Sequence, residues 1–275
     1  MNAIRKLVWD GALNVEVTID PELVIKGIPK NKTMVNLRIP RDSYIMNYLD
    51  YILTRLEAYI RVNLKDLKEL NFWFEYDGIP LSWNYPTGVL YDIMNTKDVI
   101  TAARDTNHLN MWRINLTCGS QVPRNVIPII EGTKQIEKYW MHQWKQVCFI
   151  LRGSSKQIMS ISRKEGQSFW ESILRRDMET FNNISTRIIP KKARFIPVVI
   201  HINDKFIQPV APSLNDDGIE NKVINITEGL SSSEIAIISH GVVIPKKSSL
   251  KEVYDRFLSF DGFLHLIIQE QPANT

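Results

Sequence analysis

The sequence predicts an α+β protein in which two strand-rich regions flank a helix-rich region. Short segments with alternating apolar and polar residues, typical of half-buried strands, occur before about residue 120 and again after about residue 190. Between them, apolar residues recur at helical spacing. Prolines mark both junctions, with Pro123 and Pro128 at the first and Pro190 at the second. The expected divisions are an N-terminal helix at 1–10, strand-rich regions at 11–120 and 190–275, and a helix-rich region at 121–189.

The first strand-rich region follows the short N-terminal helix, which carries Ile4, Leu7 and Val8 on one side. Strand, strand, helix, strand and strand patterns then follow at Leu13–Ile19, Val35–Ile39, Tyr44–Ile60, Phe72–Glu75 and Met111–Thr117. Elements in this order are characteristic of a β-grasp, or ubiquitin-like, fold. The sequence therefore predicts one such domain before residue 120.

The helix-rich region is expected to contain two long helices. The first includes the aromatic run Tyr139–Leu151 and should end near Gly153, a residue suited to a left-handed C-cap. Ser162 and Glu165 have the spacing of a capping box, which would open the second helix. That helix is predicted to continue, through regularly spaced apolar residues, to Ile188.

The second strand-rich region repeats the end of the first. Gly78 is followed by Tyr91, and Gly241 by Tyr254, at a spacing of 13 residues in both cases. Strands are expected at Phe195–Ile202, Lys205–Val210 and, as the two closing strands, Trp112–Leu116 and Phe263–Ile267. A turn glycine, a short helical segment and a last central strand end a ubiquitin-like fold. We therefore expect two ubiquitin-like domains around a helix-rich one.

Composition and motifs exclude several classes of function. With 275 residues, 44% hydrophobic and 23% charged, the chain resembles an ordinary soluble protein, and its net charge is +4. No signal peptide and no transmembrane run is apparent, which favours a cytosolic location. Two cysteines form neither a disulfide framework nor a usual zinc site. The familiar motifs for phosphate loops, zinc peptidases and serine hydrolases are absent, so we expect no catalytic centre, metal or cofactor.

Lys145 is the most unusual residue of the chain, because it interrupts an aromatic and aliphatic helix. The core-facing stripe of that helix should comprise Ile136, Trp140, Trp144, Val147 and Leu151. Lys145 lies about 140° from the centre of this stripe. Its neighbours on the outward face are Met141 and Phe149. An outward amine between apolar side chains indicates a docking surface, although a lysine that only extends to water from a mostly buried helix would show the same pattern.

Two other chemistries remain open alternatives. Cys148 shares the helix with Lys145, so a thiol-dependent ubiquitin-like conjugating enzyme is conceivable, but nucleophilic cysteines usually occupy exposed turns or helix starts. Basic residues, among them Lys156, Arg163 and Lys164, favour an anionic surface such as a lipid membrane. Nucleic acid is the less favoured partner, because no aromatic residues are interleaved with the basic ones. A solvated corner without a partner is the simplest alternative.

Three motifs resemble the autophagy protein 5 family of budding yeasts. They are Trp83-Asn84-Tyr85-Pro86-x-Gly88-Val89-Leu90, His142-Gln143-Trp144-Lys145-Gln146-Val147-Cys148-Phe149-Ile150-Leu151-x-Gly153-Ser154-Ser155-Lys156 and Ser259-Phe260-Asp261-Gly262-Phe263-Leu264. Together they span the whole chain, and the block around the lysine is the most specific. The resemblance implies two ubiquitin-like domains around a helix-rich domain, in agreement with the patterns above.

The resemblance also implies a function. Lys145 would accept the C-terminal glycine of autophagy protein 12 in an isopeptide bond, with Met141, His142 and Phe149 as docking residues. The conjugate would bind the N-terminal helix of the coiled-coil autophagy protein 16. The candidate residues in this sequence are Ile4, Leu7, Trp9, Trp83 and Tyr85, and packing between the domains is an equally good explanation of them.

In this family the assembly is a ligase-like scaffold, not an enzyme, and it promotes transfer of autophagy protein 8 to phosphatidylethanolamine. Further expected partners are the conjugating enzymes autophagy proteins 10 and 3. A membrane surface that is anionic or contains phosphatidylethanolamine is also expected, and nucleic acid is not. The expected location is the cytoplasm, with recruitment to the preautophagosomal structure as a peripheral membrane protein.

Overall fold

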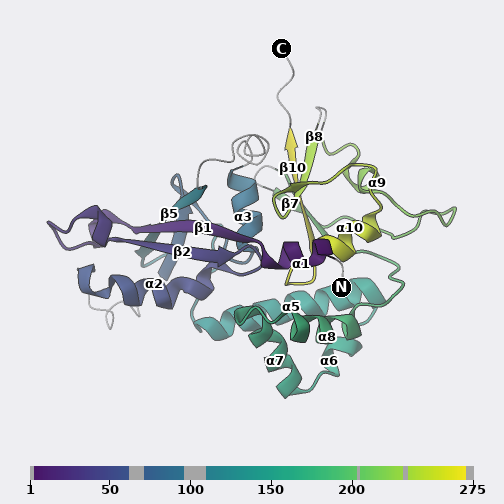
Figure 1. The fold of residues 1–275 in the computed structure, drawn as a ribbon, viewed down its shortest axis with the longest axis horizontal. Helices are drawn as coiled ribbons and strands as arrows, with labels where there is room; N and C mark the ends of the chain where they lie inside the picture. Colours follow the sequence, from purple (N-terminus) through teal and green to yellow (C-terminus); the bar gives the residue numbers. More distant parts are fainter. Residues whose placement is uncertain (1–2, 62–70, 96–109, 203–204, 232–234, 271–275) are drawn as a thin grey trace, which may run out of the picture.

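The computed structural model describes residues 3–61, 71–95, 110–202, 205–231 and 235–270. Two β-sheets and a group of helices make up the described part of the chain (Figure 1). The first sheet lies at the left of the view, the second at the upper right, and helices α5 to α8 lie below them. The predicted α+β architecture, with a helical part between two ubiquitin-like units, is confirmed.

The first sheet contains β1 (Ala12–Ile19), β2 (Met34–Pro40), β3 (Asn71–Tyr76), β4 (Ile79–Pro80) and β5 (Met111–Gly119). Their spatial order is β2-β1-β5-β3-β4. The pair β1 and β5 is parallel, and the other pairs are antiparallel. Val15 and Val17 of β1 are fully buried, because alternate side chains of this strand face the core.

The single helix predicted at Tyr44–Ile60 is in fact three short elements. A 3₁₀ helix (Ile45–Tyr48) leads into α2 (Leu49–Leu56), and a second 3₁₀ turn (Glu57–Tyr59) follows. Such 3₁₀ turns are common at the ends of α-helices and leave the apolar spacing almost unchanged, which is why the sequence pattern does not reveal them. Helix α3 (Thr87–Met94) completes this unit.

The helical part contains α5 (Thr133–Arg152), α6 (Lys156–Met159), α7 (Arg163–Leu174) and α8 (Met178–Ile188). Gly153 has a φ of +71° and caps α5, as predicted. The capping box of Ser162 and Glu165 is also present. The predicted continuous helix to Ile188 is wrong, because Arg176 adopts a φ of +57° and Asp177 caps α8. Helix α8 therefore folds back to pack against α7.

The second sheet contains β6 (Val198–Ile202), β7 (Lys205–Ile207), β8 (Ile235–Ser239), β9 (Val242–Val243) and β10 (Leu264–Glu270), with helices α9 (Val223–Thr227) and α10 (Leu250–Phe257). Its order, β7-β6-β10-β8-β9, repeats that of the first sheet, again with one parallel central pair. The matched glycines occupy matched turns, since Gly78 and Gly241 both have a φ of +76°. The predicted duplication of the ubiquitin-like unit is therefore confirmed.

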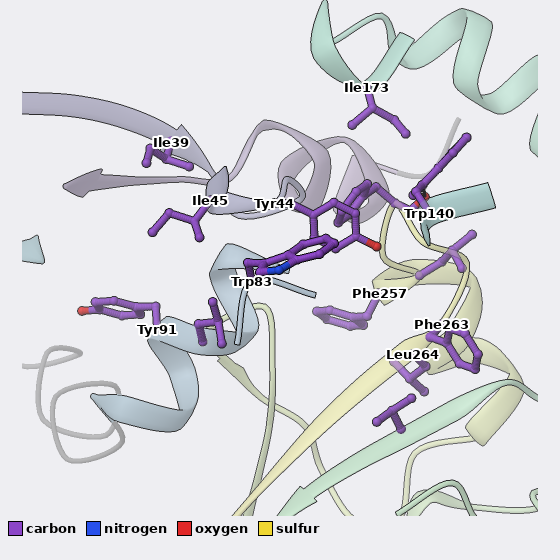
Figure 2. Packing of buried hydrophobic residues seen from close by; sticks show 14 of the residues in the cluster. Ile39, Tyr44, Ile45, Trp83, Tyr91, Trp140, Ile173, Phe257, Phe263 and Leu264 are labelled. Atoms are coloured by element: carbon purple, nitrogen blue, oxygen red, sulfur yellow. Dashed lines mark hydrogen bonds between the residues drawn. The ribbon is translucent and has the colours of Figure 1, made fainter. Parts of the chain in front are cut away.

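One hydrophobic core connects all three parts of the molecule. At their junction the ring of Tyr44 meets Trp83 from the first unit, Tyr139 from α5 and Phe260 from the second unit, at centroid distances of 5.9, 6.0 and 4.7 Å. Figure 2 shows Tyr44 beside Trp83, with Trp140 close by. The N-terminal helix α1 (Ala3–Asp10) packs against α10, so both ends of the chain contribute to this junction.

Candidate functional site

Helix α5 carries the candidate acceptor lysine and is fixed from its buried side. The predicted core stripe is confirmed, since Ile136, Trp140, Trp144, Val147 and Leu151 are all buried. The indole N–H groups of Trp140 and Trp144 both donate to the carbonyl oxygen of Phe260, at 2.8 and 3.0 Å. Because two neighbouring turns are bonded to one atom of the second ubiquitin-like unit, α5 is held in a single orientation.

Lys145 lies on the opposite side of α5, as the periodicity predicts. Its side chain is half-buried, and in the described part of the chain its Nζ has no hydrogen bond or ion pair. Met141 is half-buried, whereas His142 and Phe149 are exposed, the latter at 60%. The arrangement is an available amine on a rigid helix, with apolar side chains one turn before and one turn after it.

Two other cations of this helix, Lys138 and Arg152, are occupied elsewhere. Lys138 forms an ion pair with Glu131, which precedes the helix. The guanidinium of Arg152 donates to the backbone carbonyls of Ile188 and Arg187, at 2.6 and 3.3 Å. The described partners of Lys138 and Arg152 therefore lie away from Lys145.

Cys148 is placed unfavourably for catalysis. The residue is fully buried, and its thiol donates to the carbonyl oxygen of Ser154 at 3.3 Å. A thiol must reach the carbonyl carbon of its substrate as an exposed thiolate in order to form a thioester. The described geometry therefore disfavours the alternative of a thiol-dependent conjugating enzyme.

The candidate residues for a coiled-coil partner divide into exposed and buried ones. Ile4 and Leu7 are exposed on α1, Leu7 at 72%. Trp9 is only 1% exposed, because its ring packs against Phe181 of α8 and lies beneath the guanidinium of Arg176.

Trp83 is buried against Tyr139 of α5, and its indole N–H donates to the carbonyl oxygen of Ile127 at 2.7 Å. The burial of Trp9 and Trp83 therefore fits the alternative, packing between parts of the chain, better than a docking surface. Both side chains complete the packing between parts of the chain and leave little surface for a partner to contact.

Tyr85, the remaining candidate, borders a small cavity of about 310 Å³ where the three parts meet. Its ring stands edge-on to His201 and Phe206 of the second unit, and burial raises the pKa of its hydroxyl to about 12. Behind it, His201 Nε2 lies 3.0 Å from Nδ1 of His265, whose Nε2 lies 3.0 Å from Asp261. Sequence reasoning missed this series of polar contacts, because its two histidines are 64 residues apart along the sequence.

The predicted membrane-binding residues lie just after α5. Lys156, Arg163 and Lys164 are all exposed, and within the described ranges none of them forms an ion pair. The neighbouring carboxylate of Glu165 is bonded to Arg187 and Ser162, which lower its pKa to about 2. The three cations are thus available, and the nearest acid in the sequence is engaged with another cation.

Comparisons with known proteins match three successive regions of the chain. The family description "Autophagy protein ATG5, UblA domain" matches residues 8–118, the "alpha-helical bundle region" matches 133–191, and the "UblB domain" matches 195–268. The chain is 44% identical to autophagy protein 5 of Vanderwaltozyma polyspora, over 98% of this chain and 96% of that protein. It is 37% identical to autophagy protein 5 of Saccharomyces cerevisiae, with the same coverage.

A solved structure extends the similarity to three dimensions. The crystal structure of Kluyveromyces marxianus Atg5 superposes with a TM-score of 0.86 at 32% identity, covering 98% of this chain and all of that one. Across the described residues, no helix is both long and apolar enough to cross a membrane. Family descriptions, near full-length relatives and the superposition agree: the chain is an autophagy protein that belongs to the autophagy protein 5 family.

Proposed function

We propose that Lys145 is the acceptor of a ubiquitin-like modifier, autophagy protein 12, and that the resulting conjugate is a scaffold without a catalytic centre of its own. The observation that carries this proposal is the exposed face of α5. There the amine lacks an ion-pair partner within the described chain and lies between Met141 and Phe149. Family membership supports it, since the block from His142 to Lys156 resembles the conjugation motif of this family.

The chemistry requires little of this protein. A neutral amine of Lys145 attacks the carbonyl carbon of the modifier's C-terminal glycine, held as a thioester on a conjugating enzyme. The C–N bond forms, the C–S bond breaks, the thiolate leaves and the amine loses a proton. The protein supplies position, because α5 is fixed by Trp140 and Trp144. We infer that Met141, His142 and Phe149 contact the modifier around this bond.

The partners of the conjugate follow from the same family. We propose autophagy protein 10 as the enzyme that delivers the modifier, and autophagy protein 3 as the enzyme that the conjugate stimulates to lipidate autophagy protein 8 with phosphatidylethanolamine. The N-terminal helix of autophagy protein 16 is the proposed coiled-coil partner. With Trp9 and Trp83 buried, the candidate contacts for that helix are Ile4, Leu7 and Tyr85.

Lipidation takes place at a membrane, so the scaffold must reach one. We propose that the protein is cytoplasmic and is recruited to the preautophagosomal structure as a peripheral membrane protein. Lys156, Arg163 and Lys164 support contact with anionic lipid, because each cation near such a surface contributes about 1 kcal/mol. A total of about 3 kcal/mol allows reversible recruitment only, so the partners must add avidity.

Reconstitution of the conjugation reaction tests the assignment. The Lys145→Arg variant should give no product heavier by one modifier on a denaturing gel. The matched change Lys138→Arg, about two turns earlier in α5, should react normally. The Cys148→Ser variant should also form the conjugate, and its product should survive reductant because it is an amide. A shifted band from Lys145→Arg would overturn the acceptor assignment, and a band that reductant removes would favour the thiol alternative.

A further inference from the structure

A groove with a volume of about 860 Å³ lies between the C-terminal half of α5 and the segment that follows β7. Phe149 of α5 and Val210 of the segment after β7 both line it, and these apolar side chains are 60% and 80% exposed. Ile196 and Val198, both buried, line it from the start of the second sheet. We call this surface, lined by Phe149, Leu151, Ile196, Val198, Pro209 and Val210, the α5–β7 groove.

An interruption of the sheet edge explains why the groove exists. Antiparallel pairing of β6 with β7 reaches Ile200 and Ile207, and the same register returns where Phe195 pairs with Pro212. Between these points Pro197 and Pro209 lack the N–H groups that a ladder needs. Residues 208–210 are not paired with β6, and they carry two exposed or half-exposed apolar side chains that face no core. The opening is therefore a consequence of the sequence of this segment.

The charged side chains that line the groove are all basic. Arg152, Lys192 and Arg194 line it, all three are exposed, and the lining contains no aspartate or glutamate. Within the described part of the chain none of them forms an ion pair. Arg152 is held in place by the carbonyls of Ile188 and Arg187, so its orientation is fixed before any ligand arrives.

The groove continues beyond its apolar part. A second cavity of about 830 Å³ shares Lys192, Arg194, Phe195 and Val210 with it and extends along residues 212–216. Asp216 is the single carboxylate among its lining residues. Two adjoining hollows that share a basic wall suit a chain in extended form better than a compact ligand.

We propose that the α5–β7 groove binds a short acidic segment of a partner protein in extended conformation. One aromatic or long aliphatic side chain of that segment fills the space between Phe149 and Val210, and its carboxylates face Arg152, Lys192 and Arg194. The concave shape favours a peptide over a lipid surface, because a flat bilayer cannot enter a groove whose lining includes the buried Ile196 and Val198. The groove adjoins the proposed conjugation surface through Phe149 but goes beyond it, since Lys145, Met141 and His142 do not line the groove.

Selection from a displayed library of random twelve-residue peptides, against the full unconjugated chain, tests the proposal. The expected result is enrichment of sequences that combine several carboxylates with one large apolar residue. An enriched peptide is then synthesised with a fluorophore, and its affinity is measured by anisotropy. Replacing its apolar residue by alanine, or its carboxylates by amides, should each weaken binding about tenfold or more.

Variants of the protein locate the binding site. The double change Lys192→Glu and Arg194→Glu, and separately Val210→Ser, should each weaken binding of that peptide about tenfold. Lys192, Arg194 and Val210 are all exposed, so these changes should leave the fold intact. An unchanged midpoint of thermal unfolding would confirm this. As a charge-matched control, Arg163→Glu with Lys164→Glu should leave the affinity as in the parent protein.

The peptide-binding result does not depend on whether Lys145 is the acceptor of the modifier. Lys145→Arg should bind the peptide as well as the parent chain does, even though it accepts no modifier. The proposal is overturned if the enriched peptides carry no carboxylates, or if groove and control variants lose affinity equally. It is also overturned if vesicles with 30% phosphatidylserine bind through Lys192 and Arg194 while no peptide is enriched, because the partner would then be a lipid surface.

Discussion

Asp92 accepts a hydrogen bond from the backbone N–H of Gly241, at 2.8 Å and across 149 positions of the sequence. Asp92 belongs to α3 of the first ubiquitin-like unit, and Gly241 lies in the turn between β8 and β9 of the second. The other carboxylate oxygen accepts from the buried guanidinium of Arg41. The guanidinium itself lies 3.2 Å from where a Cβ of Gly241 would be. The hydrogen bond from Gly241 thus joins the second unit to a carboxylate that is held by a buried ion pair within the first unit.

Removal of Asp92 should destabilise the whole chain. In Asp92→Ala the guanidinium of Arg41 stays buried without its partner, and loss of one member of such a pair costs about 3–5 kcal/mol. The matched control is Glu252→Ala, which breaks an exposed pair with Arg256 and should cost less than about 1 kcal/mol. Urea unfolding followed by tryptophan fluorescence measures both. Equal costs for the two variants would show that Asp92, with its buried ion pair and its bond to Gly241, contributes no more than an exposed pair does.

Gly262→Ala should also be strongly destabilising. Gly262 has a φ of +89°, and an added Cβ would lie 3.0 Å from both γ-methyl groups of Val147 on α5. Strain and crowding together should cost about 2–5 kcal/mol. Gly218→Ala is the control, because Gly218 has a φ of +77° and nothing within 4 Å of the new Cβ. That variant should show the strain alone, about 1–2 kcal/mol. The same urea titration compares them, and a similar loss in both would remove the role of the contact with α5.

Stability should fall as the pH drops below about 6.5, the ordinary pKa of histidine. Burial, and then the neighbouring His265, hold the pKa of His201 well below that value. The unfolded chain therefore binds a proton that the folded chain rejects. The contribution of His201 is present in full above about pH 6.5 and is lost as the pH falls below it, by at most about 1.4 kcal/mol per pH unit.

Unfolding free energies measured between pH 7.5 and pH 5 check this behaviour. The variant His201→Gln should show a shallower decrease, since the glutamine side chain does not titrate. His142→Gln, a change at an exposed position of α5, is the control. If the decrease in His201→Gln is as steep as in the parent chain, other groups are responsible for it.

Contact with anionic lipid should depend on the basic residues after α5. The triple change of Lys156, Arg163 and Lys164 to glutamate should abolish flotation with liposomes that contain acidic lipid, because three attractive contacts become repulsive. Competition with duplex DNA in the same assay separates lipid from nucleic acid, since salt weakens binding to both. Flotation equal to that of the parent chain would identify these residues as a solvated corner.

Local patterns in the sequence determined much of this protein. Alternation along Leu13–Ile19, the C-cap at Gly153 and the capping box at Ser162 each depend on residues within a few positions of one another, and each is found in the structure. The repeated spacing from glycine to tyrosine was sufficient to predict a duplicated unit. The outward position of Lys145 follows from helical periodicity alone.

Tertiary structure decided which residues are buried and which residues far apart in the sequence meet. Trp9 and Trp83 have the composition of a docking surface, but they are buried because α8 and α5 happen to cover them. Nothing close in sequence relates Asp92 to Gly241, or Phe149 to Val210. Periodicity specifies which side of an element is apolar, whereas burial depends on which other element packs against it. The hydrogen bond between Asp92 and Gly241 and the α5–β7 groove therefore exist only in the folded chain.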